Sequence, residues 1–215
     1  MSFFGDFPPL RTKICGITSL EDAEAAIRSG ADALGFNFAP QSKRRIDFLG
    51  TKSWIDSLAG KITRIAVVVN PLPEDLADLR DAGCFEAVQF HGDETPEFCA
   101  SAGFPTWIKA VRVKDLKSVR EALKYPTPYL LLDAWDPTQY GGTGQRLDWD
   151  RVRDVVIDHE EKKFILAGGL DPANVRDAVR IVRPFAVDVA GGVEIDPRHK
   201  DEYLVREFIR IAKST

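Results

Sequence analysis

The sequence predicts a single-domain (β/α)8 barrel, an α/β fold in which eight parallel strands alternate with eight helices around one core. Short runs of apolar and β-branched residues recur along the 215 residues, and amphipathic stretches separate them. Strands that alternate with helices pair in parallel, and eight such units in about 200 to 250 residues are typical of this barrel. The expected strands span 12–17, 31–38, 63–69, 86–91, 106–113, 128–134, 163–169 and 185–192.

The composition of these strands also indicates a barrel. They are apolar on almost every residue, as in PYLLLDA at 128–134, which is typical of strands buried on both faces. The alternative is an open doubly wound sheet, which has fewer strands and often a G-x-G-x-x-G turn after the first one. Here the first turn reads Cys-Gly-Ile-Thr at 15–18, so the barrel is preferred.

Capping residues predict where three of the helices begin and end. The first expected helix opens on Ser19, carries acidic residues in its first turn and stops at Gly30. The helix in PEDLADLRDAG follows the same scheme and stops at Gly83. The helix in DPANVRDAVRIV is expected to open on Asp171, with Pro172 at its first helical position.

Composition and charge exclude several classes of protein. The 33 acidic and 29 basic side chains are well mixed, so no basic stripe suggests a nucleic-acid partner. No apolar run approaches the roughly 18 residues of a membrane span. Residues 1–10 lack the basic start of a signal peptide. We expect them to form an N-terminal tail, with the barrel in residues 11–215.

The cysteines and histidines indicate the compartment and argue against a metal site. The chain has three cysteines without a C-x-x-C pair, and three histidines. This pattern argues against a disulfide framework or structural zinc and favours a reducing compartment, the cytoplasm. We expect no metal and no cofactor. Monomer and homodimer both remain open.

Chemistry in a barrel of this type is found at the C-terminal ends of the strands. Cys15 ends the first strand, and Lys13, Cys15 and Ile17 are expected to share one face of it. A cation about 7 Å before the thiol, at roughly 3.3 Å per residue, lowers the thiol pKa and favours a reactive thiolate. The alternative is a packed core cysteine.

Asp133 follows three leucines at the end of the sixth strand. A buried acid is costly unless it is paired or faces a polar cavity. One interpretation is a helix cap or an ion-paired acid. The other is a general acid that burial keeps protonated.

Two glycine pairs end the last two strands, in LAGGL and VAGGVE. Loops after the seventh and eighth strands commonly bind phosphate in this fold, and glycine lets backbone N–H groups approach an anion closely. The pairs therefore predict a phosphate site. Its residues are Gly168, Gly169, Gly191 and Gly192.

Three further segments have open interpretations. Arg44 and Arg45 follow the second strand, and they are either a carboxylate clamp or solvated surface charges. His91 ends the fourth expected strand. Its role is an aromatic wall of the site, a hydrogen-bond donor or a structural one, and we do not expect it to be the base. The glycine-rich loop 135–149 lacks a Walker Lys-Ser/Thr, and it is either a lid or an ordinary connection.

Together these motifs resemble the phosphoribosylanthranilate isomerase family of tryptophan biosynthesis. The matching segments occur in order along nearly the whole chain. They are KICGIT, GADALGFNFAPQSKRRI, VQFHGDE, LLLDA with YGGTGQRLDW, LAGGLDPANV, and RPFAVDVAGGVE with KD. The resemblance implies a (β/α)8 barrel without metal or redox cofactor. Its implied substrate is the phosphosugar N-(5-phospho-β-D-ribosyl)anthranilate, and its product is 1-(2-carboxyphenylamino)-1-deoxy-D-ribulose 5-phosphate.

The resemblance also implies roles for matching residues. Cys15 matches the general base, Asp133 the general acid, and Arg44 the arginine that binds the anthranilate carboxylate. Asp188 matches an aspartate near the substrate, and the glycine segments match the phosphate site. The chain departs from the family at Ala190-Gly191-Gly192, where Ser-Ser-Gly is common, and at Arg45, where an aromatic or small residue is common.

Two rival functions belong to different classes. The sister isomerase of histidine biosynthesis performs the same rearrangement, but that family has an acid at the position of Cys15, although bifunctionality stays open. A degenerate phosphosugar-binding barrel without activity is the other rival, and the presence of both Cys15 and Asp133 argues against it.

Overall fold

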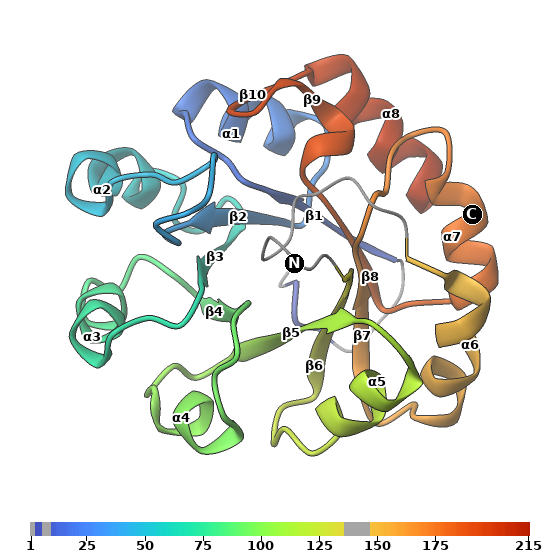
Figure 1. Cartoon of the computed structure of the whole chain (residues 1–215). Helices are drawn as coiled ribbons and strands as arrows, with labels where there is room; N and C mark the ends of the chain where they lie inside the picture. The colour runs from blue at the N-terminus through green and yellow to red at the C-terminus, as the bar shows by residue number, and fades with distance from the viewer. Residues whose placement is uncertain (1–2, 6–9, 136–146) are drawn as a thin grey trace.

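The chain folds into a closed barrel of eight parallel strands, each followed by a helix on the outside (Figure 1). This computed structural model describes residues 3–5, 10–135 and 147–215. The barrel strands are β1 (Arg11–Cys15), β2 (Ala33–Asn37), β3 (Thr63–Val68), β4 (Ala87–Phe90), β5 (Trp107–Val113), β6 (Tyr129–Ala134), β7 (Lys163–Leu166) and β8 (Ala186–Val189). The helices are α1 (Leu20–Arg28), α2 (Phe48–Asp56), α3 (Pro73–Asp81), α4 (Pro96–Ser101), α5 (Leu116–Ala122), α6 (Trp149–Asp158), α7 (Val175–Val182) and α8 (Glu202–Lys213).

The predicted fold class is confirmed. Each expected strand overlaps one observed strand, and β1 closes the ring by pairing with both β2 and β8. The Ser19 side chain accepts a hydrogen bond from the Asp22 amide, and therefore caps α1 as predicted.

The expected start of α7 was wrong. The helix begins at Val175, because Asp171 forms a separate turn before it. The Asp171 carboxylate accepts from the Ala173 and Asn174 amides, and the Asn174 side chain accepts from the Asp171 amide. These side-chain bonds compete with the first helical turn.

Apolar side chains fill the inside of the barrel, and one of them, Phe3, comes from the N-terminal segment. Phe3 is fully buried, its amide donates to the Thr63 hydroxyl, and its carbonyl accepts from the Arg11 guanidinium. The ring packs with small and branched side chains from seven strands. They are Ala33, Ile65, Ala87, Ile108, Ala110, Leu131, Ile165, Ala167 and Ala186, and the described strands enclose them as a packed core rather than a pore.

A second apolar layer lies between the strands and the helices. It contains the alternate strand residues, such as Ile14, Leu34, Val88 and Phe90, and the inner faces of the helices. Ile17 also belongs to it. The expectation that Ile17 shares the inward face with Cys15 was wrong, because β1 ends at Cys15 and the turn at Gly16 breaks the alternation.

Three short elements follow β8. They are the 3-10 turn η1 (Gly191–Val193) and the hairpin strands β9 (Glu194–Asp196) and β10 (His199–Lys200). The hairpin joins the barrel mouth to α8, and its residues enter the site described below. Among the described residues, no helix combines the length and the apolar character that crossing a membrane requires.

Candidate active site

Polar side chains form a layer inside one end of the barrel. Gln89, Asp133 and Asp188 each lie two residues after an apolar residue of the inner filling, so they point to the same side of their strands. Lys13 and Cys15 occupy the matching positions on β1. We call these five residues the polar layer. All five are buried, and each lies within the last three residues of its strand.

Cys15 lies beside Lys13 in this layer. A β-carbon added at Gly35 of β2 would lie 2.7 Å from the Cys15 Sγ and 3.0 Å from the Lys13 Nζ. Glycine at this position therefore leaves the space that both side chains use. Lys13 also donates to Asp188 Oδ1 at 2.8 Å, across the β1–β8 pairing.

The predicted effect of Lys13 on the cysteine was too large. Burial raises the pKa of the Cys15 thiol, and the attraction of Lys13 lowers it by less, so the pKa of Cys15 lies above its ordinary value. The Asp188 carboxylate also raises this pKa. The free protein therefore holds Cys15 mainly as the thiol at neutral pH.

Lys200 connects Cys15 to the loops around it. Its ammonium donates to the Cys15 carbonyl at 2.7 Å, to the Ala190 carbonyl at 3.2 Å and to Glu194 Oε1 at 2.7 Å. Burial lowers the pKa of Lys200, while Glu194 opposes that shift. The hairpin that follows β8 thus holds the ends of both β1 and β8.

Arg44 is held by the same glutamate. Its Nε and Nη2 donate to the two oxygens of Glu194, both at 2.7 Å, and this hydrogen bonding raises the pKa of Arg44. Its guanidinium lies against Gly191. Arg45 is exposed, and its carbonyl accepts from Arg198. Of the two arginines, Arg44 is the one that lies next to Cys15 and the glycine turns.

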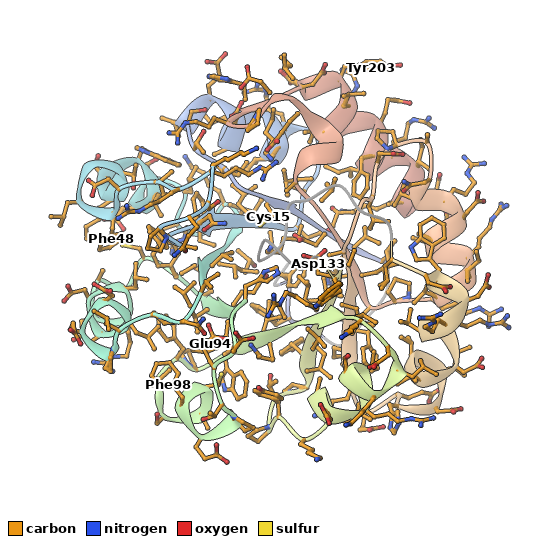
Figure 2. All side chains as sticks on the ribbon, in the orientation of Figure 1. Cys15, Phe48, Glu94, Phe98, Asp133 and Tyr203 are labelled. Atoms are coloured by element: carbon orange, nitrogen blue, oxygen red, sulfur yellow. The ribbon has the colours of Figure 1, made fainter. Side chains whose placement is uncertain are left out.

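Asp133 and His91 face each other across the barrel end. His91 Nε2 lies 3.2 Å from Asp133 Oδ2, although the pair does not have the geometry of a hydrogen bond. Asp133 Oδ1 accepts from the Ala134 amide. The acid is therefore neither a helix cap nor part of a Lys or Arg ion pair among the described residues. Figure 2 shows Cys15 and Asp133 near the centre of the barrel.

The glycine pairs lie directly beside these groups. Gly168 and Gly169 have positive φ angles, and a β-carbon at Gly168 would lie 3.3 Å from Asp133 Oδ1. A β-carbon at Gly192 would overlap the Leu170 carbonyl. Within the described part of the chain, the N–H groups of the four predicted glycines donate to no protein acceptor. The structure thus brings the glycines next to the polar layer.

Some residues of the site were not predicted, and part of one predicted feature is not described. Sequence reasoning missed Lys200 and Glu194, which no local pattern marks, and Gln89, whose signal is an amide at an inward position of an apolar strand. Most of the expected lid, residues 136–146, lies outside the described residues. The described residues hold no group of three or more acidic, cysteine or histidine side chains placed for a metal ion.

Comparison with known proteins decides the family. The sequence profile of N-(5'-phosphoribosyl)anthranilate (PRA) isomerase matches residues 12–211. The chain is 47% identical to the isomerase of Geobacter sulfurreducens over 207 residues, which cover 95% of this chain and 98% of that protein. The chain belongs to the PRA isomerase family. The predicted family is thereby confirmed.

Other PRA isomerases are similar in sequence and structure. The enzyme of Thermotoga neapolitana is 44% identical over 95% of this chain and 98% of that protein. The crystal structure from Thermotoga maritima has a TM-score of 0.87 and 40% identity, covering 96% of this chain and all of that one. A PRA isomerase structure solved with reduced 1-(o-carboxyphenylamino)-1-deoxyribulose 5-phosphate has a TM-score of 0.84 and 38% identity over the same coverage.

Proposed function

We propose that this member of the PRA isomerase family isomerises N-(5'-phosphoribosyl)anthranilate in tryptophan biosynthesis, with Cys15 as general base and Asp133 as general acid. One observation carries the assignment of roles. Cys15 on β1 and Asp133 on β6 both belong to the buried polar layer, and the β7 and β8 ends with their glycine turns lie between them in the ring. A sugar phosphate bound at those turns therefore has the Cys15 thiol on one side and the Asp133 carboxyl group on the other.

The acid step opens the sugar ring. Asp133 gives its proton to the furanose oxygen, the C1′–oxygen bond breaks, and its electron pair goes to that oxygen. The anthranilate nitrogen supplies electrons to C1′, so an iminium cation forms. Positioned acids of this kind contribute about 10²- to 10⁴-fold to rates. Gly168 supports the step, since its lack of a side chain leaves room beside Asp133.

The base step removes the C2′ proton. The iminium makes this proton acidic, and the Cys15 thiolate takes it, which gives an enolamine that tautomerises to the aminoketose. The side chains around the cysteine carry one more positive than negative charge in their usual ionised forms. They are Lys13, Lys200 and Arg44 against Asp188 and Glu194. A thiolate neutralises this excess, and the nearby iminium favours it further.

The glycine turns are assigned to the phosphate. The loops after β7 and β8 each carry two of these glycines, whose N–H groups donate to no acceptor among the described residues, and this fold commonly binds phosphate there. Backbone N–H groups bind anions without the help of hydroxyl groups. The replacement of Ser-Ser by Ala190-Gly191 is therefore compatible with phosphate binding.

Arg44 is assigned to the anthranilate carboxylate. An arginine has five N–H donors, and Glu194 accepts from two of the N–H groups of Arg44. The remaining donors are available for a carboxylate, and the ion pair fixes the plane of the guanidinium. Asp188 is assigned an indirect role near the substrate. Its ion pair with Lys13 holds that lysine beside Cys15.

The remaining assignments follow from this activity. The reaction moves protons and electrons within one molecule, so we propose that it proceeds without metal or cofactor. We also propose a cytoplasmic enzyme whose partner is a small phosphosugar rather than nucleic acid or a membrane. A crystal structure of monomers generated from the dimeric Thermotoga maritima enzyme has a TM-score of 0.84 and 38% identity to this chain.

Turnover of the two pathway substrates tests the proposed function. The purified chain is expected to convert N-(5'-phosphoribosyl)anthranilate and to lose at least about 10²-fold in kcat on Asp133→Asn. The histidine-pathway phosphosugar is the comparison substrate, and Asp115→Asn, an exposed helix cap, is the matched control. No turnover of the anthranilate substrate would overturn the assignment, as would turnover of the histidine substrate alone.

A further inference from the structure

Gln89 is a buried amide inside the barrel with one unpaired end. It is fully buried on β4, its Nε2 donates to His91 Nδ1 at 3.0 Å, and its Oε1 has no hydrogen-bond partner among the described residues. A buried polar atom without a partner lowers the stability of the folded state. An aliphatic side chain at this position would avoid that loss, so packing alone does not account for the amide.

The contact with Gln89 fixes the tautomer of His91. In this orientation of the Gln89 amide the nitrogen faces the ring and can only donate, which requires Nδ1 to accept and places the ring proton on Nε2. That nitrogen is the one that lies 3.2 Å from Asp133 Oδ2. The Gln89 amide, the His91 imidazole and the Asp133 carboxyl group therefore follow one another inside the barrel.

The loop that carries His91 is held on both sides. The His91 amide donates to the Val68 carbonyl at 2.8 Å. Lys109 donates to the Phe90 carbonyl at 3.3 Å and the Gly92 carbonyl at 2.6 Å, which flank the histidine, and it is paired with Glu94 at 2.7 Å. These contacts hold the backbone around His91, and the contact with Gln89 holds its ring.

We propose that Gln89 is a positioning residue that keeps the His91 Nε2–H directed at Asp133, where it stabilises the carboxylate left after the acid step. The inference rests on the proposed role of Asp133. When Asp133 gives its proton to the ring oxygen, a negative charge appears on its carboxyl group inside the barrel. The Nε2–H then donates to Oδ2 while the Ala134 amide donates to Oδ1. Hydrogen bonds at catalytic groups are often long in the free enzyme and shorten as charge develops.

The first test measures the tautomer directly. The ¹⁵N chemical shifts of the His91 ring report which nitrogen carries the proton, and the chain has only three histidines to assign. We expect the wild type to carry the proton on Nε2 and Gln89→Leu to show a mixture of both tautomers. Gln89→Glu has only acceptor oxygens when ionised, so we expect its ring to carry a proton on Nδ1. A wild-type ring protonated on Nδ1, or shifts unchanged in Gln89→Leu, would overturn the proposal.

The second test separates kcat from KM. In this proposal Gln89 acts on Asp133 only through His91, so we expect Gln89→Leu to lose about 10- to 100-fold in kcat, the size found when a partner that orients a metal-bound imidazole is lost, with KM unchanged. Gln41→Leu, at an exposed position, is the matched control. A folded Gln89→Leu protein with wild-type kcat would contradict the proposed positioning role of Gln89. Full activity of Asp133→Asn would instead contradict the proposed function, and the ¹⁵N shifts would still report on Gln89.

Discussion

The Lys13 ammonium lies 2.8 Å from Asp188 Oδ1, inside the barrel and beside the catalytic candidate Cys15. The pair joins β1 to β8 at directly opposed positions. Burial lowers the pKa of Lys13, but the charge and the hydrogen bond of Asp188 oppose this shift, and the pKa of Lys13 is raised. The lysine therefore stays charged. Because Asp188 offsets part of this charge, it weakens the effect of Lys13 on the pKa of the Cys15 thiol.

The first prediction concerns the pH dependence of Cys15 reactivity. Because burial raises the pKa of this thiol, its alkylation rate is expected to rise with pH and to reach half its maximum above the pH of an ordinary cysteine. A base must be deprotonated, so the acidic limb of the kcat/KM profile is expected to lie at the same high pH. Iodoacetamide labelling followed by mass spectrometry of the Cys15 peptide measures the midpoint.

Two variants test the sign of this effect. The Asp188 carboxylate raises the pKa of Cys15 and Lys13 lowers it, so Asp188→Asn is expected to move the labelling midpoint down and Lys13→Gln to move it up. Asp177→Asn, on the exposed side of α7, should leave it unchanged. Midpoints that move together, or in the opposite order, would show that Lys13 and Asp188 do not control the thiol.

The second prediction compares the two adjacent arginines. Arg44→Ala is expected to raise KM, because truncating one partner of a desolvated charge pair costs on the order of 2–5 kcal/mol. Arg45→Ala should change KM little, since Arg45 is exposed. Arg44→Lys keeps the charge but loses the planar fork, and it should fall between the two. Steady-state kinetics decide the order, and a larger effect of Arg45→Ala would mean that the wrong arginine is assigned.

The third prediction concerns the phosphate site. Crystals grown with phosphate are expected to hold an ion against the backbone at Gly168–Gly169 and Gly191–Gly192. Gly192→Ala should weaken inhibition by phosphate about tenfold or more, because its β-carbon overlaps the Leu170 carbonyl and the turn must move. The β-carbon of Gly191→Ala would meet the end of the Arg44 side chain at 3.3 Å and Glu194 Oε2 at 4.0 Å, and this substitution should have a smaller effect. An ion that prefers another face of the barrel would contradict the assignment.

The fourth prediction concerns the N-terminal segment. Phe3 is fully buried against the apolar filling of the barrel and contacts the Phe4 and Phe185 rings. Phe3→Ala should therefore lower the free energy of unfolding by about 3–5 kcal/mol, as for other buried aromatic side chains. Leu49→Ala removes a side chain that is 84% exposed and should have almost no effect. Urea titration compares them, and equal midpoints for both variants would show that Phe3 does not pack inside the barrel in solution.

The sequence predicts the barrel because its strands and helix caps are local signals. The strand residues are apolar on both faces, and the Ser19 cap depends on contacts within one turn. The start of α7 was wrong because two local patterns competed at Asp171, and the turn formed by its side chain prevailed. Cys15 and Asp133 stood out because a reactive or acidic residue at the end of an apolar strand is unusual.

The rest of the site depends on contacts between residues far apart in the chain. Arg44 and Glu194 are 150 residues apart, and Lys200 is 185 residues from the Cys15 carbonyl that it binds. The pKa of Cys15 depends on a balance between its burial and the charges of Lys13, Asp188 and Lys200. That balance becomes available only when the three-dimensional arrangement is known.

The central claim, that Cys15 is the general base, is tested most directly by the kcat of Cys15→Ser. The substitution nearly preserves volume, and Cys84→Ser is the matched control, since Cys84 is also buried but lies in the outer apolar layer. If both variants keep the wild-type far-UV circular dichroism and melt cooperatively, we expect Cys15→Ser to lose about 10²-fold or more in kcat and Cys84→Ser to retain it. Wild-type turnover by a folded Cys15→Ser protein would contradict the account, because the cysteine would then serve only for packing.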